Sequence, residues 1–391
     1  MLIETTAGDL RLALDTVQAA VPRRSTIPIL CAVLLQDGAV RGTCLDMEIS
    51  VRFAAKRFDG AAVIPFRQLH ELVKSLPADL DLRIQSKGDD YGVHLFFRGG
   101  RYKLPSFPAT DFPTWTGNGD LAEMAKPDGF RAALDACTGF ISTEETRYHL
   151  NGVCFSKDPD GKSVLVATDG HRLIAYDFAH ECEINLILPR ATVLALLGMV
   201  EPEEVLFSDS NMEFRFPGGS YLRTKLIDGT FPDWTRVVPA YPEDTRRISF
   251  APLEMKKALD RMRRLTGQRN RGLSISASAN GDLLVVTMNG MDGEECAERI
   301  ESGSAEHWQG AQAFYGFNSS YLSELCQLHR QAERISIVAP DAGSPAKVGP
   351  DETKATTVLM PMRVDEGTLV RTALLTFAGG ANDQDAKEAA A

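Results

Sequence analysis

Apolar residues recur in three stretches of the chain at the spacing of a helix that buries one side. In each stretch the positions i, i+3 or i+4, and i+7 are apolar, and this pattern predicts an amphipathic helix with a single buried stripe. The three sets are Leu10, Leu14, Val17 and Val21; Phe130, Ala133, Leu134, Cys137 and Ile141; and Met255, Leu259, Met262 and, more loosely, Leu265. Their recurrence at similar intervals indicates an internal repeat.

A second short helix is predicted later in each repeat. In each case an apolar strand end is followed by Pro or Asn and then by a short amphipathic run. Pro65 and Pro189 are 124 positions apart, and Pro189 and Asn318 are 129 apart. Pro suits the first turn of a helix and Asn suits its cap, so all three residues are expected at helix starts.

Short alternating runs between these helices predict antiparallel strands. Lys162 to Ala167 and Leu283 to Met288 are such runs, and Asp-Gly or Asn-Gly pairs break them as in hairpins. We therefore predict an α+β chain of three repeated domains, each with two helices packed on antiparallel sheets. Chance likeness within an ordinary multidomain protein is the alternative. The predicted segments are domains at 1–120, 121–244 and 245–365, then a partly disordered extension at 366–391.

The composition narrows the class of protein. A hydrophobic content of 44% is sufficient for packed cores, and no apolar run reaches the roughly 18 residues of a membrane span. Met1–Glu4 lacks the basic and apolar regions of a signal peptide. Seven cysteines, an odd number without a C-x-x-C pair, favour reduced core side chains over a disulfide framework. A cytoplasmic protein is expected.

Three segments are similar to catalytic signatures but lack residues that those signatures require. Asp160–Ser163 ends like a P-loop, yet Ser156 stands where the motif needs glycine, and the segment lies between two predicted strands. His70 has no second histidine at the spacing of a zinc-protease helix. Asp169–His171 is more typical of a tight turn than of an acid–base pair. Because no nucleophile, base and oxyanion donor come together, we predict neither catalysis nor a cofactor or metal.

Six further segments carry a family resemblance, in order along the chain. They are Thr26–Leu30, Arg147–Val153, Ala167–Leu173, Lys225–Asp233, Gly316–Asn318 and Leu359–Arg363. Together they resemble the bacterial sliding clamps, the beta subunits of DNA polymerase III, over residues 1 to about 364. The resemblance implies a non-catalytic processivity factor that forms a head-to-tail homodimer. Each chain would supply half of a six-domain ring, with helices around a central hole and sheets outside.

Such a ring would explain how an acidic chain, with a net charge of −11, could hold DNA. Proteins that hold DNA through phosphate contacts usually carry a basic excess, whereas a closed ring holds it by enclosure. Twelve helices spaced about 8–10 Å apart give a circle of axes roughly 32–38 Å across, and subtracting a helix diameter of about 10 Å leaves room for a duplex. The basic residues proposed for the hole are Lys256, Lys257, Arg190, Arg261, Arg263 and Arg264. The plain alternative is a solvated helix face.

The resemblance also implies positions for DNA contact. The expected residues are Arg24, Arg147, Tyr148, His149 and Arg190. Arg24 and Tyr148 match family positions that touch DNA, and His149 stands where the family often has an aromatic residue. Glu144 stands where some members have a neutral polar contact. Its carboxylate would repel a phosphate, so the chain departs from the family at this loop.

The resemblance to the sliding clamps also implies a pocket that binds partner peptides. Its residues are expected to be Leu150, Thr168, Gly170, His171, Arg172, Leu173, Pro232, Arg236, Val237, Tyr321, Ser344, Val358, Met360, Pro361, Met362 and Arg363. Leu, Val and Met would form an adaptable apolar floor, and Arg and His at the rim could hold a peptide carbonyl or glutamine. The implied partners are the replicative polymerase, the clamp loader and repair or translesion polymerases, through short peptides with Leu and Phe. Without the resemblance, core and edge-strand roles would be favoured.

The subunit interface would pair Tyr102 and Leu104 of the first domain with Leu265 of the third domain of a second copy. Arg264 and Arg269 could form salt bridges across this joint. Arg264 replaces an apolar residue of better-known members, so a more polar contact is expected here.

The chain also continues past Arg363, where most clamps end. Ala373–Phe377 loosely imitates the Leu/Phe peptides, so one hypothesis is that the extension folds back into the pocket; the alternative is a strand extension and a loose end.

Two other functions of the whole protein stay open. A divergent accessory clamp is suggested by the extension, Glu144 and Arg264. A hydrolase or nuclease on the same repeats would need carboxylates that converge on a metal, and the sequence shows no such cluster.

Overall fold

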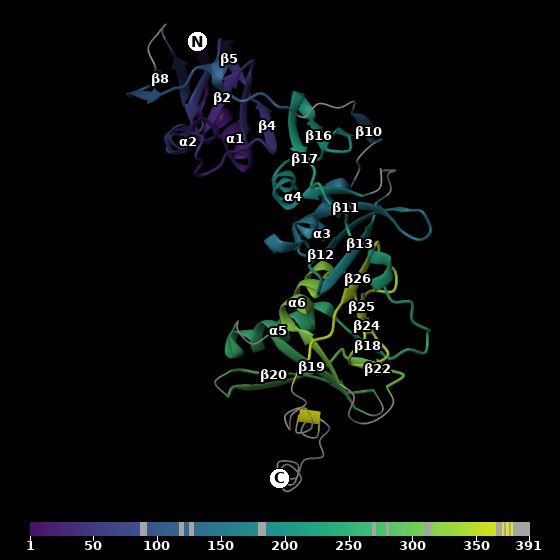
Figure 1. Ribbon diagram of the computed structural model, residues 1–391. Helices are drawn as coiled ribbons and strands as arrows, with labels where there is room; N and C mark the ends of the chain where they lie inside the picture. Colours follow the sequence, from purple (N-terminus) through teal and green to yellow (C-terminus); the bar gives the residue numbers. More distant parts are fainter. Residues whose placement is uncertain are drawn as a thin grey trace. The chain divides into compact units, whose positions relative to one another are not determined.

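Three pairs of packed helices follow one another along the chain, as the apolar spacing predicts (Figure 1). In the first pair α1 (Ala7–Val17) packs on α2 (Phe66–Lys74), in the second α3 (Phe130–Thr138) packs on α4 (Arg190–Leu197), and in the third α5 (Pro252–Thr266) packs on α6 (Ser319–Leu328). This computed structural model describes residues 1–86, 92–116, 121–124, 129–178, 185–267, 271–278, 281–291, 293–308, 314–364, 370, 373–374 and 377.

The helices begin where the sequence signals place them. The side chain of Thr6 accepts a hydrogen bond from the amide of Asp9 at 3.1 Å and caps α1. Asn318 caps α6 by accepting from the amide of Ser320 at 3.0 Å, while Pro65 and Pro189 immediately precede α2 and α4. Each cap satisfies an amide that the helix itself leaves unpaired.

The predicted apolar stripes are buried over most of their length. Leu10, Leu14 and Val17 are fully buried in α1, but Val21 follows the helix in extended backbone. Ile141 likewise lies beyond the end of α3. Leu265 is 59% exposed and lies off the buried face of α5, which continues from Met262 to Thr266.

The structure divides into two compact units, each described by itself. The first comprises Met1–Thr138, Glu145–Lys157 and Phe178–Phe231, and the second comprises Gly139–Glu144, Asp158–Asp177 and Pro232–Ala391.

The first unit contains two antiparallel sheets and a further strand pair. One sheet has the order β5-β1-β7-β8-β9 and the other the order β10-β15-β16-β17-β4-β3-β2-β6, while β11 pairs with β14. Their bounds are β1 Leu2–Thr6, β2 Ala32–Gln36, β3 Ala39–Thr43, β4 Met47–Arg52, β5 Ala55–Asp59, β6 Ala62–Pro65, β7 Asp81–Gln85, β8 Gly92–Phe97, β9 Gly100–Pro105, β10 Ala122–Met124, β11 Gly152–Lys157, β14 Leu186–Pro189, β15 Glu204–Phe207, β16 Asn211–Phe216 and β17 Ser220–Lys225.

The second unit also contains two antiparallel runs of strands. Their orders are β12-β13-β26-β25-β24-β18-β22 and β21-β20-β19-β23. The bounds are β12 Ser163–Thr168, β13 Arg172–Asp177, β18 Arg247–Phe250, β19 Gly272–Ala277, β20 Leu284–Asn289, β21 Glu295–Ile300, β22 Ser304–Glu306, β23 Phe314–Asn318, β24 Ile335–Val338, β25 Ala346–Gly349 and β26 Ala355–Leu359. Asp160–Ser163 forms the expected turn, with the Asp158 amide donating to the Lys162 carbonyl at 2.8 Å and Gly161 at a φ of 83°.

Strands from different repeats pair side by side at two places. In the first unit β17 pairs antiparallel with β4, so that Leu222 lies opposite Ile49. In the second unit β13 pairs antiparallel with β26, so that Leu173 lies opposite Val358. All four of these side chains are buried. Backbone hydrogen bonds and shared core therefore join consecutive repeats into continuous sheets.

A charged network crosses the joint between β17 and β4. Glu213 accepts hydrogen bonds from Arg215 at 2.8 Å and from Arg223 at 2.7 Å. Arg223 also lies 3.9 Å from Glu48, which accepts a hydrogen bond from the Tyr221 hydroxyl at 2.9 Å. Burial by itself would raise the pKa of Glu213, but the bonds and charges of the two arginines outweigh it and hold the pKa below its ordinary value.

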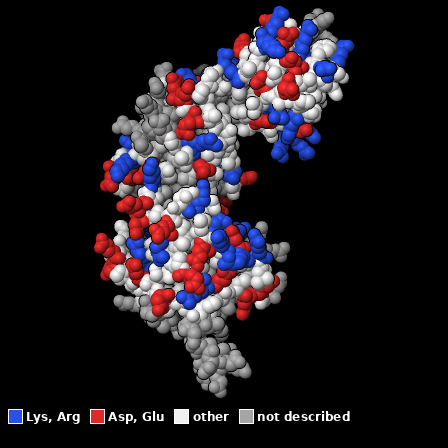
Figure 2. Space-filling model, turned by 180° about the vertical axis from the view of Figure 1, so that it is seen from behind, with Lys and Arg blue, Asp and Glu red and all other residues white. Residues whose placement is uncertain are grey.

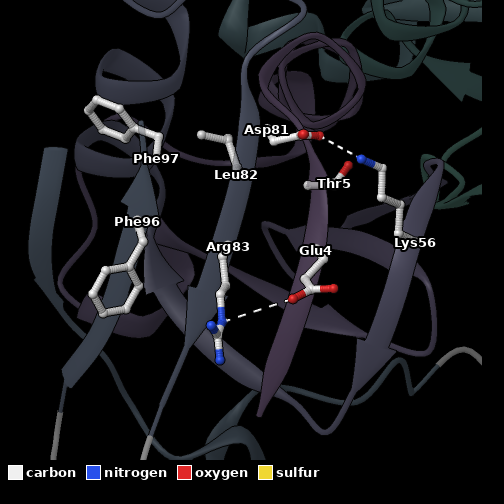
Figure 3. A pocket seen from close by; sticks show the side chains of 8 residues that line it. All are labelled: Glu4, Thr5, Lys56, Asp81, Leu82, Arg83, Phe96 and Phe97. Atoms are coloured by element: carbon white, nitrogen blue, oxygen red, sulfur yellow. Dashed lines mark hydrogen bonds and ion pairs between the residues drawn. The ribbon is translucent and has the colours of Figure 1, made fainter. Parts of the chain in front are cut away.

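A shallow hollow lies over β1, β7 and β8 in the first unit (Figure 3). Two cross-strand ion pairs line it: Lys56 with Asp81 at 2.8 Å and Arg83 with Glu4 at 4.0 Å. Because the charges neutralise each other in pairs, we interpret this hollow as part of a solvated sheet face.

The extension after residue 364 differs from both sequence-based expectations. Val370, Ala373, Leu374 and Phe377 are helical, where a strand extension was predicted. Ala373 is buried with Leu283 and Val285, and Leu374 and Phe377 pack on the same cluster. Of the segment expected to enter the pocket, Ala373, Leu374 and Phe377 therefore pack on a sheet instead, where burial removes their apolar surface from water; Leu375 and Thr376 lie outside the described residues.

The lowered pKa of Glu213 makes the first unit sensitive to acid. A carboxyl with a depressed pKa contributes stability that is fully present above its unfolded value, near 4.5, and is lost as the pH falls below it through the folded-state pKa. We expect Glu213→Gln to flatten the decline of the unfolding free energy below about pH 4.5. Urea unfolding at several pH values measures this, with the exposed Glu203→Gln as control. Parallel profiles for wild type and Glu213→Gln would contradict the account.

Candidate functional site

The turn between β12 and β13 carries five of the residues predicted for the peptide pocket or its motif. Gly170 has a φ of 87°, a left-handed conformation that glycine adopts without strain. The Asp169 carboxylate accepts from the amides of His171 at 2.9 Å and Arg172 at 3.0 Å, and the Thr168 hydroxyl donates to the Arg172 carbonyl at 2.7 Å. The prediction of a tight turn is confirmed, and its side chains fix the direction in which His171 and Arg172 leave the sheet.

Arg172 is the centre of this region. Its side chain is 7% exposed, donates to Asp169 at 3.1 Å and to Glu324 of α6 at 2.7 Å, and also donates to the Gly139 carbonyl. The guanidinium lies over the Tyr321 ring, 4.2 Å from its centroid. Two carboxylates and an aromatic face hold the charge in place, so Arg172 organises the site from below and does not form part of its rim.

Tyr321 and His171 complete one side of the site. The two rings are stacked with centroids 6.3 Å apart and an interplanar angle of 25°. Partial burial, followed by the nearby charge of Asp169, raises the pKa of the Tyr321 phenol, so the group stays neutral and able to donate a hydrogen bond at neutral pH. His171 is exposed, as expected of a rim residue.

The segment after β26 supplies exposed apolar side chains beside this turn. The Met360 amide donates to the His171 carbonyl at 2.8 Å, and the Met362 amide donates to the Gly316 carbonyl at 2.8 Å. The two methionine side chains are 38% and 39% exposed. Fixed backbone with flexible apolar side chains provides an adaptable binding surface.

The structure gathers some predicted pocket residues more closely than others. Hydrogen bonds, ring contacts and strand pairing connect eight of them: Thr168, Gly170, His171, Arg172, Leu173, Tyr321, Val358 and Met360. Pro361, Met362 and Arg363 continue the same segment. Arg236 and Val237 are the last residues of the short 3-10 helix Trp234–Val237, and Pro232 lies just before it. Arg236 forms an ion pair with Asp233 at 2.8 Å.

Two further predicted pocket residues have other neighbours among the described contacts. Ser344 lies near Tyr241 and Asp341, whose pKa values it affects through hydrogen bonds. Leu150 is buried in the first unit. Conversely, Phe140 and Glu324 contact Arg172 but were not predicted. The position of Glu324, one turn after Tyr321 on the same face of α6, was the available signal.

A second set of predicted residues lies in the first unit. Arg147, Tyr148 and His149 occupy the 3-10 segment Glu145–Leu150, which is kinked at Arg147 (φ −115°, ψ 50°). Tyr148 is 55% exposed and meets His149 edge to face at 5.8 Å. A Cβ at Gly229 would lie 3.1 Å from His149 and 3.4 Å from Tyr148, so glycine allows the close approach that positions these rings.

Arg190 lies close to this aromatic pair along the backbone. Its amide donates to the Asn151 carbonyl at 2.9 Å, and the Asn151 amide donates to the Tyr148 carbonyl at 3.0 Å. Arg190 is the first residue of α4, and two successive backbone hydrogen bonds through Asn151 connect it to Tyr148. Arg24 is exposed on a loop of the same unit, whereas Glu144 belongs to the other unit.

The basic face of α5 is partly neutralised by neighbouring acids. Lys256 pairs with Asp260 at 2.7 Å, and Arg261 donates to Glu298 at 3.1 Å. Lys257 and Arg264 are exposed. On the described residues of the face seen in Figure 2, acidic and basic side chains are intermingled, so basic character is local.

Comparison with known proteins identifies the family. Residues 3–116 match the N-terminal domain, and residues 125–233 the central domain, of the DNA polymerase III beta subunit. The beta sliding clamp of Caulobacter vibrioides is 32% identical over 370 residues, which cover 90% of this chain and 97% of that protein. The chain belongs to the bacterial beta sliding clamp family. The beta sliding clamp of Escherichia coli K12 is 29% identical over 369 residues, which cover 90% of this chain and 96% of that protein.

Solved clamp structures share the fold. A sliding clamp from Bartonella birtlesii bound to griselimycin superposes with a TM-score of 0.82 at 27% identity and covers 93% of this chain and 100% of its own. The Caulobacter crescentus polymerase III beta subunit gives a TM-score of 0.80 at 29% identity with the same coverage. The predicted clamp fold is thus confirmed.

Membership of the clamp family settles the class of activity. Beta sliding clamps are non-catalytic processivity factors of DNA polymerase III, so this clamp acts on DNA and with a polymerase without chemistry of its own. The hydrolase alternative is wrong, and the relatives do not favour the divergent accessory clamp. Within the described residues, no helix is both long enough and apolar enough for a membrane crossing.

Arg172 offers a direct test of the site's construction. Removing one partner of a buried ion pair leaves the other charge uncompensated, so Arg172→Ala should lower the unfolding free energy of the second unit by roughly 3 kcal/mol. The exposed Arg330→Ala, two residues after the end of α6, should change it by less than about 0.5 kcal/mol. Guanidinium unfolding measures both. Equal effects of the two substitutions would show that Arg172 does not organise this region.

Proposed function

We propose that two copies of this clamp pair head to tail through strands β9 and β21 and close a ring around duplex DNA. The support comes from the order of strands in the repeats. In the described part of every repeat, four or five strands lie between the two helices and three strands follow the second helix. The third strand after the first helix is β4, β13 or β21, and the third strand after the second helix is β9, β17 or β26.

Both internal joints pair these two kinds of strand. β17 pairs with β4, and β26 pairs with β13. The remaining strands of each kind are β9 and β21, and both lie at the edge of their sheets. An edge strand exposes unpaired backbone groups that another chain can use. Repeating the same joint once more between copies uses both edges and closes a symmetric dimer.

The side chains of β9 suit such a joint. Tyr102 lies opposite the buried Leu95, and Leu104 lies opposite the buried Val93, so both point to the core face of their sheet. Tyr102 is nevertheless 47% exposed. The equivalent side chains of β17, which lies at an internal joint, are buried. A second copy would bury Tyr102 and Leu104 in the same way, with the exposed Leu265 and Arg264 of α5 nearby as the predicted partners; Arg269 lies outside the described residues.

The charges of the two edges are opposite. β9 carries Arg101 and Lys103, whereas β21 carries Glu295 and Glu298 against a single Arg299, so the strands have net charges of +2 and −1. Facing strands with opposite charges attract, and two copies of the same edge repel, which favours head-to-tail pairing. The proposed domains, 1–120, 121–244 and 245–365, each contribute one helix pair and two half-sheets to this ring.

Enclosure accounts for DNA binding by an acidic chain. Arg24, Arg147, Tyr148, His149 and Arg190 of the first unit are proposed to touch the duplex together with the basic residues of α5. Phosphate contacts of this kind position DNA without reading its sequence. The clamp can therefore slide, because retention depends on topology and not on any single contact. In the bacterial cytoplasm, such a clamp would be associated with the nucleoid.

The site around Arg172 is proposed as the dock for partner peptides. Met360 and Met362 offer adaptable apolar contacts, and His171 and Tyr321 offer aromatic faces and hydrogen bonds. We propose that short Leu- and Phe-containing peptides of the replicative polymerase, the clamp loader and repair or translesion polymerases bind here. The relative bound to griselimycin supports a ligand site on this fold.

Release from DNA tests the proposal of enclosure. The clamp is loaded on nicked circular DNA with a clamp loader, isolated by gel filtration and then treated with a restriction enzyme. An enclosing ring stays on the circle and leaves after linearisation, because it slides off the ends. If the bound fraction is the same on circular and linear DNA, the clamp binds by affinity and the ring is contradicted.

Charge reversal tests the proposed joint. Lys103→Glu places like charges across β9 and β21, so we expect the dimer to weaken by about tenfold. Glu295→Lys in the same chain should restore part of the affinity, because the facing charges become opposite again. Analytical ultracentrifugation measures both variants, with Lys162→Glu in the β11–β12 turn as control. A joint formed elsewhere would leave all variants with the wild-type dissociation constant.

A further inference from the structure

The last sheet of the chain is buried on two faces. Every residue of β20 from Leu284 to Met288 is buried. Successive side chains of a strand point to opposite faces of its sheet, so something covers each face. Helix α5 packs against β20 and β21 and accounts for one of them.

The middle strand of the corresponding sheet is also buried in the second repeat. The strands equivalent to β20 are β3 and β12, each the second strand after the first helix of its repeat. Ser163 to Ala167 of β12 are all buried, whereas Arg41 of β3 is half-buried. Burial on both faces is therefore not confined to the third repeat, and in that repeat the second cover is identified by its contacts.

The second face of β20 is covered by the extension that follows the clamp domains. Ala373 is buried in one cluster with Leu283 and Val285, and Leu374 and Phe377 pack on it together with Ala297 of β21. Val370 is buried as well. Positions 370, 373, 374 and 377 follow the i, i+3, i+4, i+7 spacing of one helix face, and all four residues are helical.

Small residues form a row across the sheet that the extension covers. Ser274 lies opposite Thr287, and Thr287 opposite Ala297, so small side chains line one row of the face. Gly316 continues that row, and a Cβ there would lie 2.1 Å from the Met362 carbonyl oxygen. Met362 and Val364 therefore lie close against this row at Gly316, and only a residue without a Cβ permits this approach.

We propose that the extension is an internal brace: it holds β20 and β21 in place and so strengthens closure of the ring at β21. The role in closure rests on the proposed pairing of β9 with β21, whereas the brace on β20 stands on the packing described above. An edge strand that is ordered before association loses less conformational entropy on pairing. Removing the brace should therefore loosen β21 and speed the separation of subunits.

Truncation with a matched control tests this brace. Removing residues 366–391 deletes the apolar stripe, whereas removing residues 379–391 leaves it intact. Hydrogen exchange of the β20 and β21 amides and subunit exchange between labelled dimers are measured for both. We expect the longer truncation to speed both processes by about tenfold or more, and the shorter one to leave both as in the full chain.

Phe377→Ser provides a milder change if the long truncation aggregates. This side chain is only partly buried, so the variant should fold and show a smaller acceleration in the same direction. Unchanged hydrogen exchange in the truncated and substituted chains would overturn the brace. Faster hydrogen exchange with unchanged subunit exchange would overturn its role in closure. Retention on circular DNA in the same samples shows whether the ring itself forms, so the two proposals fail separately.

Discussion

Edge-to-edge pairing of antiparallel strands is the interaction on which the rest of this structure depends. At β17–β4 and at β13–β26, backbone hydrogen bonds and buried side chains such as Leu222 and Val358 join one repeat to the next. The joint uses the same two strand positions each time, so the chain ends with one unused strand of each kind. An open edge of this type is a hazard for a soluble protein. In the proposed ring both edges are covered by a second copy, and the hazard becomes the means of assembly.

Charged residues reinforce the joints between strands. The network of Glu213 with Arg215 and Arg223 lies on a joint and reinforces it, while the opposite charges of β9 and β21 would select head-to-tail over other pairings. The net charge of −11 is then no obstacle to a DNA-binding role. A ring needs only a modest local excess of positive charge along the duplex, because enclosure and not affinity keeps it there.

Much of the fold was predictable from the sequence, because the repeated stripes, helix caps and turns are local signals. Val21, Ile141 and Leu265 were assigned to helical stripes but lie beyond or outside them, since periodicity does not show where packing stops. In the site, the turn at Gly170 was predictable from Asp-Gly. The burial of Arg172 between Asp169 and Glu324 was not, because Glu324 is distant in sequence. The extension was misjudged because Ala373–Phe377 suits a peptide mimic and a helix equally well.

The most direct test of the account is cross-linking at the proposed joint. A photoreactive amino acid replaces Tyr102 on β9, the sample is irradiated in solution, and the linked peptides are identified by mass spectrometry with isotopically mixed subunits. The account predicts links to Glu295–Ile300 or to the end of α5 in the other copy, and a doubly linked dimer that survives denaturation. Links confined to the same chain, or directed to another surface of the second copy, would contradict it.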